Sequence, residues 1–189
     1  MIIMGLEDEY QQALKFVEKV DFHISNGPSK GFETNIRYLG GLLSAYDLRG
    51  DAILLIKAVE LTDNVLMPLF DTPTGAPYTY YDVISDMAQV TETINLAEFG
   101  SYTVEFTRLS QITGDLKYVN AANGIVDKAI TQPSRMPGLY PNDWKVNPFE
   151  PLNDSKLCLL LYYDTLERLP EFFFLLFAYN LLNFFFISN

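Results

Sequence analysis

The sequence predicts an all-α fold made of antiparallel helical hairpins. Apolar residues recur at helical spacing in several successive segments. Two Gly-Asp pairs, Gly50-Asp51 and Gly114-Asp115, lie 64 residues apart, and each interrupts such an apolar pattern. No window alternates convincingly with the period of two that a half-buried strand would show. These observations predict helices joined in pairs at the Gly-Asp turns and argue against a β-sheet as the main architecture.

The first predicted element is a lead-in helix over residues 7–20. Its inward face is expected to consist of four side chains at helical spacing: Tyr10, Ala13, Leu14 and Val17.

The first hairpin is expected within residues 32–81. Gly50 ends its first helix, and Asp51 can cap the second. The apolar stripes of the two helices are Ile36, Leu39, Leu43 and Tyr46, and then Ile53, Leu54, Ala58, Leu61 and Val65.

The second hairpin is expected within residues 92–149, which form a weak repeat of the first. Its turn is Thr113-Gly114-Asp115, and the stripes beside it are Leu109 and Ile112, and then Val119, Ala122, Val126 and Ala129. The 64-residue period is longer than that of tetratricopeptide, ankyrin or HEAT repeats, so the extra length lies in loops.

Two of these loops, residues 71–82 and 131–144, combine Pro and Gly with Tyr or Trp. Loops of this kind often carry function, and exposed aromatic rings beside hydrogen-bonding groups suit pyranose faces. The alternative is that the rings fasten each loop to the helices beneath it.

Composition excludes several classes of partner and site. The 189-residue chain has a formal net charge of −11, and its basic residues are scattered among acidic ones, so we expect no nucleic-acid partner. A neutral sugar is compatible with that charge. Cys158 is the single cysteine, which excludes an intrachain disulfide and a cysteine-based zinc site.

The two ends of the chain are predicted to differ in character. Residues 1–9 show neither the basic region nor the apolar length of a signal peptide. Residues 172–189 hold seven of the fourteen Phe, but this run is shorter than the about 20 apolar residues of a membrane helix and is broken by Asn180 and Asn183. We therefore expect no membrane span.

Glu33 and Arg37 are the strongest site candidates. They place one carboxylate and one guanidinium four residues apart, on one face of a helix that is otherwise apolar or small. From the pattern alone, an ordinary ion pair near a helix N-terminus, worth a few tenths of a kcal/mol, is the simpler interpretation.

Four ordered motifs change that interpretation, because together they resemble glycoside hydrolase family 47, the inverting α-1,2-mannosidases that trim N-glycans. The motifs are Phe32-Glu-Thr-Asn-Ile-Arg-Tyr-Leu-Gly-Gly-Leu-Leu-Ser-Ala-Tyr46, Phe70-Asp-Thr-Pro-Thr-Gly-Ala-Pro-Tyr78, Ala97-Glu-Phe-Gly-Ser101 and Leu109-Ser-Gln-Ile-Thr-Gly-Asp115. The resemblance covers about residues 20–149. It implies part of an (α/α)7 barrel, namely about two helical hairpins plus the lead-in helix.

The resemblance also implies roles for three residues. Glu33 matches the general acid, and Arg37 matches a sugar-binding position. Glu98 lies in the third motif and is assigned to substrate binding; the alternative is a carboxylate satisfied among buried helices. When the Gly-Asp turns are aligned, Glu98 falls one residue from the position of Glu33, an offset of about 100° on an α-helix. Glu105 is expected on the helix surface, and His23 in a loop.

A calcium ion is implied as the cofactor, held in this family through a threonine near the C-terminal end of the domain, with water and substrate oxygens. No segment here matches the surroundings of that threonine. No His-Glu-x-x-His, EF-hand or paired-cysteine spacing occurs either, so no protein metal ligands are predicted.

From residue 150 the chain departs from the family pattern, and residues 150–189 are expected to be a divergent Phe-rich tail outside the family fold. The domain is therefore expected over residues 1–149, without the catalytic base. Two hypotheses follow. In the first, the chain is part of an α-1,2-mannosidase and is inactive alone. The substrate of that enzyme is then a mannose-containing oligosaccharide or glycoprotein of the secretory pathway. In the second, the chain is a non-catalytic helical module that binds glycans weakly or self-associates through uncovered apolar faces.

Overall fold

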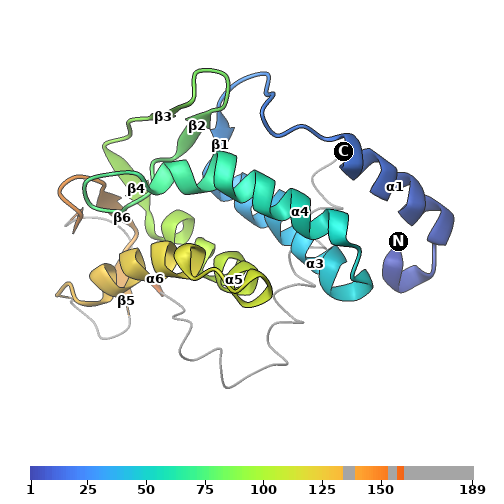
Figure 1. Ribbon diagram of the computed structural model, residues 1–189. Helices are drawn as coiled ribbons and strands as arrows, with labels where there is room; N and C mark the ends of the chain where they lie inside the picture. Colours follow the sequence, from blue (N-terminus) through green and yellow to red (C-terminus); the bar gives the residue numbers. More distant parts are fainter. Residues whose placement is uncertain (134–138, 153–156, 160–189) are drawn as a thin grey trace.

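A computed structural model describes residues 1–133, 139–152 and 157–159. This part of the chain is mostly helical, as predicted, with short strands at one end of the helices (Figure 1). The Phe-rich segment at residues 172–189 lies outside the described residues. Among the described residues, no helix has the length and apolar character that crossing a membrane requires.

The first predicted hairpin is confirmed. Its first helix is continuous and ends at Gly50, whose φ of 75° suits glycine and whose N–H donates to the Tyr46 carbonyl. The elements of this helix are α2 (Gly31–Thr34), a π-helical turn η2 (Asn35–Leu39) and α3 (Gly40–Arg49). The returning helix consists of α4 (Ala52–Leu61), η3 (Thr62–Leu66) and η4 (Met67–Phe70).

The second hairpin is also confirmed, with α5 (Leu96–Thr113) packed antiparallel against α6 (Lys117–Ile130). Gly114 ends α5 in the same left-handed conformation as Gly50, at a φ of 75°. Its N–H donates to the Ser110 carbonyl, the counterpart of the Gly50 bond. The shared glycine geometry confirms the two turns on which the hairpin prediction rested.

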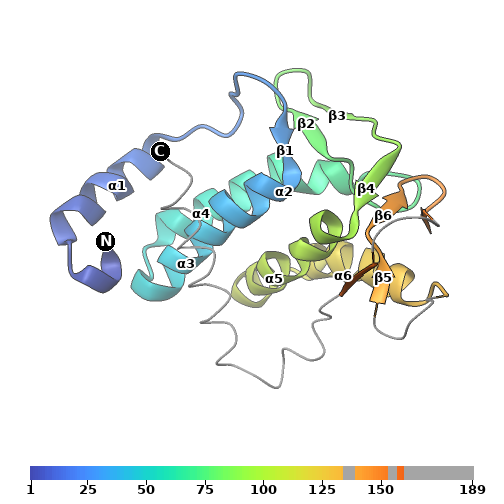
Figure 2. The same ribbon diagram turned by 180° about the vertical axis from the view of Figure 1, so that it is seen from behind.

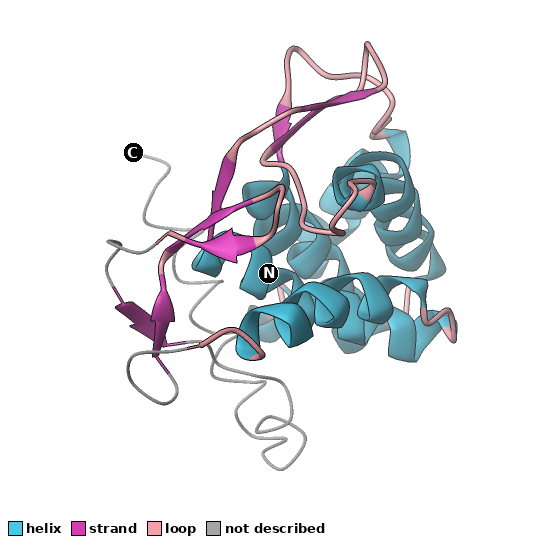
Figure 3. Cartoon of the chain, turned by 90° about the vertical axis from the view of Figure 1, so that its left-hand side faces the viewer, coloured by secondary structure: helices cyan, strands magenta, loops and turns pink. Residues whose placement is uncertain are grey.

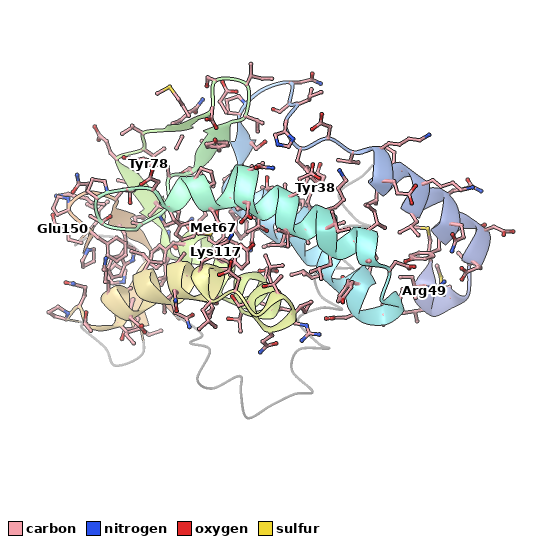
Figure 4. The ribbon with its side chains drawn as sticks, in the orientation of Figure 1. Tyr38, Arg49, Met67, Tyr78, Lys117 and Glu150 are labelled. Atoms are coloured by element: carbon pink, nitrogen blue, oxygen red, sulfur yellow. The ribbon has the colours of Figure 1, made fainter. Side chains whose placement is uncertain are left out.

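The lead-in helix is α1 (Glu7–Lys19), preceded by a short turn η1 (Ile2–Met4). Arg49 fastens it to the first hairpin, because its two terminal nitrogens donate to the Glu7 carboxylate at 3.0 and 2.7 Å and its guanidinium lies 4.6 Å from the Tyr10 ring centre (Figure 4). The Tyr10 hydroxyl donates to Asp51. Asp51 stands at the N-cap position of α4, but its side chain accepts from Tyr10 and not from a helix N–H, so the expected side-chain cap is absent.

The described part of the chain contains eight short strands that were not predicted from the sequence. They are β1 (Ser29–Lys30), β2 (Tyr80–Asp82), β3 (Met87–Gln89), β4 (Thr93–Asn95), β5 (Leu139–Pro141), β6 (Asp143–Lys145), β7 (Glu150–Pro151) and β8 (Leu157–Leu159). With two or three residues each, they are too short to show a period of two. They gather on one side of the helices, at the end opposite the Gly-Asp turns (Figures 1 and 3).

The strands complete the repeat, because each hairpin is flanked by two strands that pair with each other. Before and after the first hairpin, β1 pairs antiparallel with β2, with Ser29 opposite Tyr81. Around the second, β4 pairs antiparallel with β6, with Ile94 opposite Trp144. The repeating unit is therefore strand, helix, helix, strand. Beyond residue 149, β7 pairs with β6, and β8 pairs with β5.

The core lies between the two hairpins and beneath the strands. Phe70, Tyr102 and Phe106 pack edge to face or tilted, with ring centres 5.0 to 5.6 Å apart. The largest fully buried side chains are Trp144, Tyr102, Tyr118, Phe99, Phe106, Leu39, Leu61, Leu66, Leu69, Leu96, Leu109 and Ile125.

The π-helical turn η2 changes the predicted offset between Glu33 and Glu98. Glu33 precedes its turn glycine by 17 residues and Glu98 by 16, yet each is the third residue of its helix. A single π-turn accommodates one extra residue within an α-helix. The helical phase of Glu33 relative to Gly50 therefore matches that of Glu98 relative to Gly114, and the expected rotation of about 100° does not apply.

Gly31 lies against side chains of both hairpins, and this close packing gives a stability prediction. A Cβ at this position would lie 2.3 Å from both Leu69 Cδ1 and the Tyr102 hydroxyl, two buried side chains. We expect Gly31→Ala to lower the free energy of unfolding by about 1–3 kcal/mol, measured by urea denaturation. Gly41→Ala, within α3 and with nothing within 4 Å of the added Cβ, is the matched control and should raise stability by about 0.5–1 kcal/mol. Equal effects of the two substitutions would contradict this packing.

Candidate active site

Glu33 and Arg37 lie on the helix that begins the first hairpin, at the end near the strands (Figure 2). The Arg37 Nε–H donates to Glu33 Oε2, so the predicted pair is present. Both side chains remain about one third exposed, at 39% for Glu33 and 32% for Arg37. Solvent screening keeps the contribution of such a pair to stability small. The carboxylate and the guanidinium are therefore accessible to a ligand.

Glu98 occupies the corresponding place on α5 and is more buried, with 15% of its side chain exposed. Its backbone N–H donates to the side chain of Asn95, which caps the helix. Its carboxylate accepts from Lys30 Nζ at 2.6 Å. Glu98 is thus a carboxylate with a cationic partner, close to a ligand-accessible end of the helices.

Lys30 is the residue that sequence reasoning missed. It lies at the end of β1, directly before α2, and its hydrogen bond to Glu98, together with the nearby charge of Glu33, raises its pKa. The ammonium therefore connects the N-terminal ends of two helices, one from each hairpin. A signal was present in the sequence, since Lys30 is the basic residue closest to the Glu33 motif on its N-terminal side.

The prediction that Glu105 lies on the helix surface is wrong. Glu105 is only 7% exposed, and its Oε2 accepts from Asn35 Nδ2 at 2.8 Å. Burial raises the pKa of Glu105 to about 7, although the bond from Asn35 opposes the shift. The physical reason for the error is helical phase. Glu105 lies seven residues after Glu98, two turns along α5, and so shares its inward face.

The described residues do not fit the calcium ion that the family resemblance implies. Asp21, His23 and Glu60 form the one group that could hold a metal in this part of the chain. It offers an imidazole nitrogen and two carboxylates, whereas calcium takes six to eight oxygen ligands. Lys57 Nζ also donates to Glu60 at 2.8 Å, placing a cation where a metal would bind. His23 is exposed in a loop, as predicted.

Of the aromatic residues in the two long loops, one fastens its loop to the helices and another is exposed. Trp144 is fully buried, and its ring stacks on Phe149 with centres 4.9 Å apart. Its Nε1–H donates to the Pro141 carbonyl at 2.7 Å. This ring fastens the loop to the core. Tyr80, by contrast, is 38% exposed on β2. Residues 134–138 of the second loop lie outside the described residues.

Comparison with known proteins places these features in a family. The model of glycosyl hydrolase family 47 matches residues 1–156 of the 189. The chain belongs to glycosyl hydrolase family 47. The match runs past residue 149 and includes β7, so the departure expected from residue 150 falls partly within the family match.

Individual family 47 proteins are similar over the same region. Mannosyl-oligosaccharide 1,2-alpha-mannosidase IB of Mus musculus is 42% identical over 149 residues, covering 75% of this chain and 23% of the relative. An endoplasmic reticulum mannosyl-oligosaccharide 1,2-alpha-mannosidase of Rattus norvegicus is 39% identical over 145 residues, covering 75% and 22%. The chain thus spans about a quarter of the length of these family 47 relatives.

A solved family structure has the same fold. The alpha-1,2-mannosidase from Trichoderma reesei superposes with a TM-score of 0.75 at 32% identity, covering 82% of this chain and 35% of that one. The predicted fold class is therefore confirmed: the chain forms part of an (α/α)7 barrel, including two helical hairpins and a lead-in helix.

Proposed function

We propose that this chain supplies the general acid and part of the sugar-binding surface of an inverting α-1,2-mannosidase. Glu33 is assigned as the acid, and Arg37 and Glu98 as substrate-binding residues. The observation that carries the proposal is the partly exposed Glu33–Arg37 pair. The pair lies at the start of a helical hairpin, in the motif that resembles the one carrying the general acid of family 47.

The geometry supports distinct tasks for the two glutamates. An inverting glycosidase needs an acid for the leaving oxygen and a base for water, with carboxyls about 6.5–9.5 Å apart. Glu98 accepts from Lys30, and its carboxylate oxygens have further lone pairs that can accept hydrogen bonds from sugar hydroxyls. Arg37 can donate to a hydroxyl through the nitrogens that do not contact Glu33.

The proposed substrate is a terminal α-1,2-linked mannose of an oligosaccharide or glycoprotein. The names of the mouse and rat relatives support this substrate class, and the rat name supports a compartment in the secretory pathway. Calcium stays a family expectation. The described residues do not form a site for it.

A non-catalytic helical module is the second candidate. Large apolar side chains are exposed on several helices, among them Phe16 at 70%, Tyr38 at 59% and Ile56 at 58%. A partner or a second copy of the chain would cover such side chains. A stable dimer that binds no sugar would favour this function, whereas a monomer that binds mannose-α-1,2-mannose would favour the first.

We expect the 189-residue chain to release no detectable mannose from mannose-α-1,2-mannose, with or without calcium. Among the described residues, the other carboxylates near Glu33 are occupied or buried: Glu98 by Lys30, and Glu105 in the core. An acid without a base cannot complete inversion. The measurement is released mannose over time. Calcium-dependent release that disappears in Glu33→Gln would show that the chain contains a complete site.

The assignment of Glu33 as the acid is tested by placing residues 1–149 in the matching part of a complete family 47 enzyme. There, Glu33→Gln should lower kcat on the disaccharide by about 10²–10⁴. The same variant should largely retain activity on α-mannosyl fluoride, whose leaving group needs no protonation. An equal loss on both substrates would contradict the acid role, and Glu98→Gln, expected to raise KM, is the comparison for substrate binding.

A further inference from the structure

The buried carboxyl of Glu105 lies beside both ends of the π-helical turn η2. At the first end, Asn35 Nδ2 donates to its Oε2 at 2.8 Å. At the other end, Gly40, which follows η2 directly, lies so close that an added Cβ would be 3.3 Å from Oε1 and 3.7 Å from Cγ. Glu105 therefore packs against the residues that open and close this turn.

The side chain of Asn35 has few other hydrogen-bond partners. Asn35 is fully buried, and its Nδ2 makes a second, longer contact of 3.5 Å to the Ser101 carbonyl. Its Oδ1 has no hydrogen-bond partner among the described residues. Both contacts of Nδ2 reach α5, so the amide is held by the second hairpin. Without Glu105, the buried amide would keep only the longer contact.

The π-helical turn η2 lies at the Glu33–Arg37 pair. Arg37 lies within η2, and Glu33 lies in the α-helical turn before it. Single π-turns are rare in helices and frequent at functional sites. If η2 relaxed to α-helical hydrogen bonding, residues 31–34 would rotate by about 100° relative to α3. The Glu33 carboxylate would then no longer point where the present pair holds it.

We propose that Glu105 is a positioning residue, which fixes the π-turn η2 through Asn35 and Gly40 and thereby the orientation of Glu33 and Arg37. This inference rests on the proposed function for its catalytic meaning. The structural link it asserts, from the buried carboxyl to the accessible pair, is testable without any catalysis.

The test uses the full 189-residue chain and the ¹⁵N–¹H signal of Arg37 Nε, assigned with Arg37→Lys. Because this N–H donates to Glu33, its chemical shift reports the pair directly. Glu105→Ala should shift the signal toward that of a free arginine side chain. Glu105→Gln, whose amide oxygen can still accept from Asn35, should retain the wild-type position. Thr107→Ala, a change at a buried polar residue of the same helix, should leave it unmoved.

Two results would overturn the inference. One is a wild-type Arg37 signal in Glu105→Ala despite lowered stability, which would make Glu105 a purely structural residue. The other is an equal shift in Thr107→Ala. Should Glu105→Ala fail to fold, Gly40→Ala is the milder variant, since its added methyl presses on the Glu105 carboxyl, and the same shift is expected. Failure of the wild-type chain to bind mannose-α-1,2-mannose would contradict the proposed function and leave this readout intact.

Discussion

Replacing Trp144 by alanine is expected to lower the free energy of unfolding by about 3–5 kcal/mol, the largest loss anticipated for a single substitution in this chain. The indole is fully buried, stacks on Phe149 and meets Phe99 edge to face at 5.7 Å between ring centres. Its removal leaves a cavity between β6 and α5 and removes the hydrogen bond from Nε1 to the Pro141 carbonyl. Urea denaturation followed by circular dichroism measures the change.

Phe16→Ala is the matched control for this prediction. Phe16 is also a large aromatic residue, but it is 70% exposed on α1, so its truncation should change stability by less than about 0.5 kcal/mol. A similar loss in both variants would mean that Trp144 is not the anchor between the second long loop and the core.

The second large effect is a dependence of stability on pH that arises from Glu105. Burial raises its pKa to about 7 in the folded chain, whereas an unfolded glutamate titrates near about 4.3. Between these values the folded state holds a proton that the unfolded chain releases. The contribution of Glu105 to stability is therefore greatest below about pH 4.3, falls as the pH rises toward 7 and then levels off, a change on the order of 3 kcal/mol.

Glu105→Gln isolates this contribution, because the glutamine does not titrate while every other group still does. The free energy of unfolding of Glu105→Gln minus that of wild type, measured from pH 4 to 8, should increase up to about pH 7 and then level off. A difference that stays constant over this range would show that the Glu105 carboxyl is not protonated preferentially in the fold.

The helical hairpins could be predicted from the sequence because their signals are local. The stripes from Ile36 to Tyr46 and from Val119 to Ala129 repeat over several turns, and the glycines at 50 and 114 end their helices in a conformation that other residues adopt poorly. The positions of Glu33 and Arg37 on one helix followed from the same spacing. Their pairing is confirmed, while their chemical roles stay predictions.

The features that escaped prediction depend on contacts between distant segments. The strands are only two or three residues long, and their pairing joins Lys30 to Tyr80 and Ile94 to Trp144. The bond between Lys30 and Glu98 joins the two hairpins through residues that are 68 positions apart in sequence. The burial of Glu105 depends on Asn35, which is 70 residues away. Periodicity within one segment carries no information about such partners.

The π-turn also determines how the two halves of the chain should be compared. An ungapped superposition of the Gly-Asp turns sets Glu33 against Ala97, whereas a one-residue gap placed within residues 35–39 sets it against Glu98. With that gap, the two repeated units each carry an acidic residue at the third position of their first helix. Glu33 and Glu98 are then structural counterparts, each three residues beyond the end of a strand that pairs with the strand at the far end of its own hairpin.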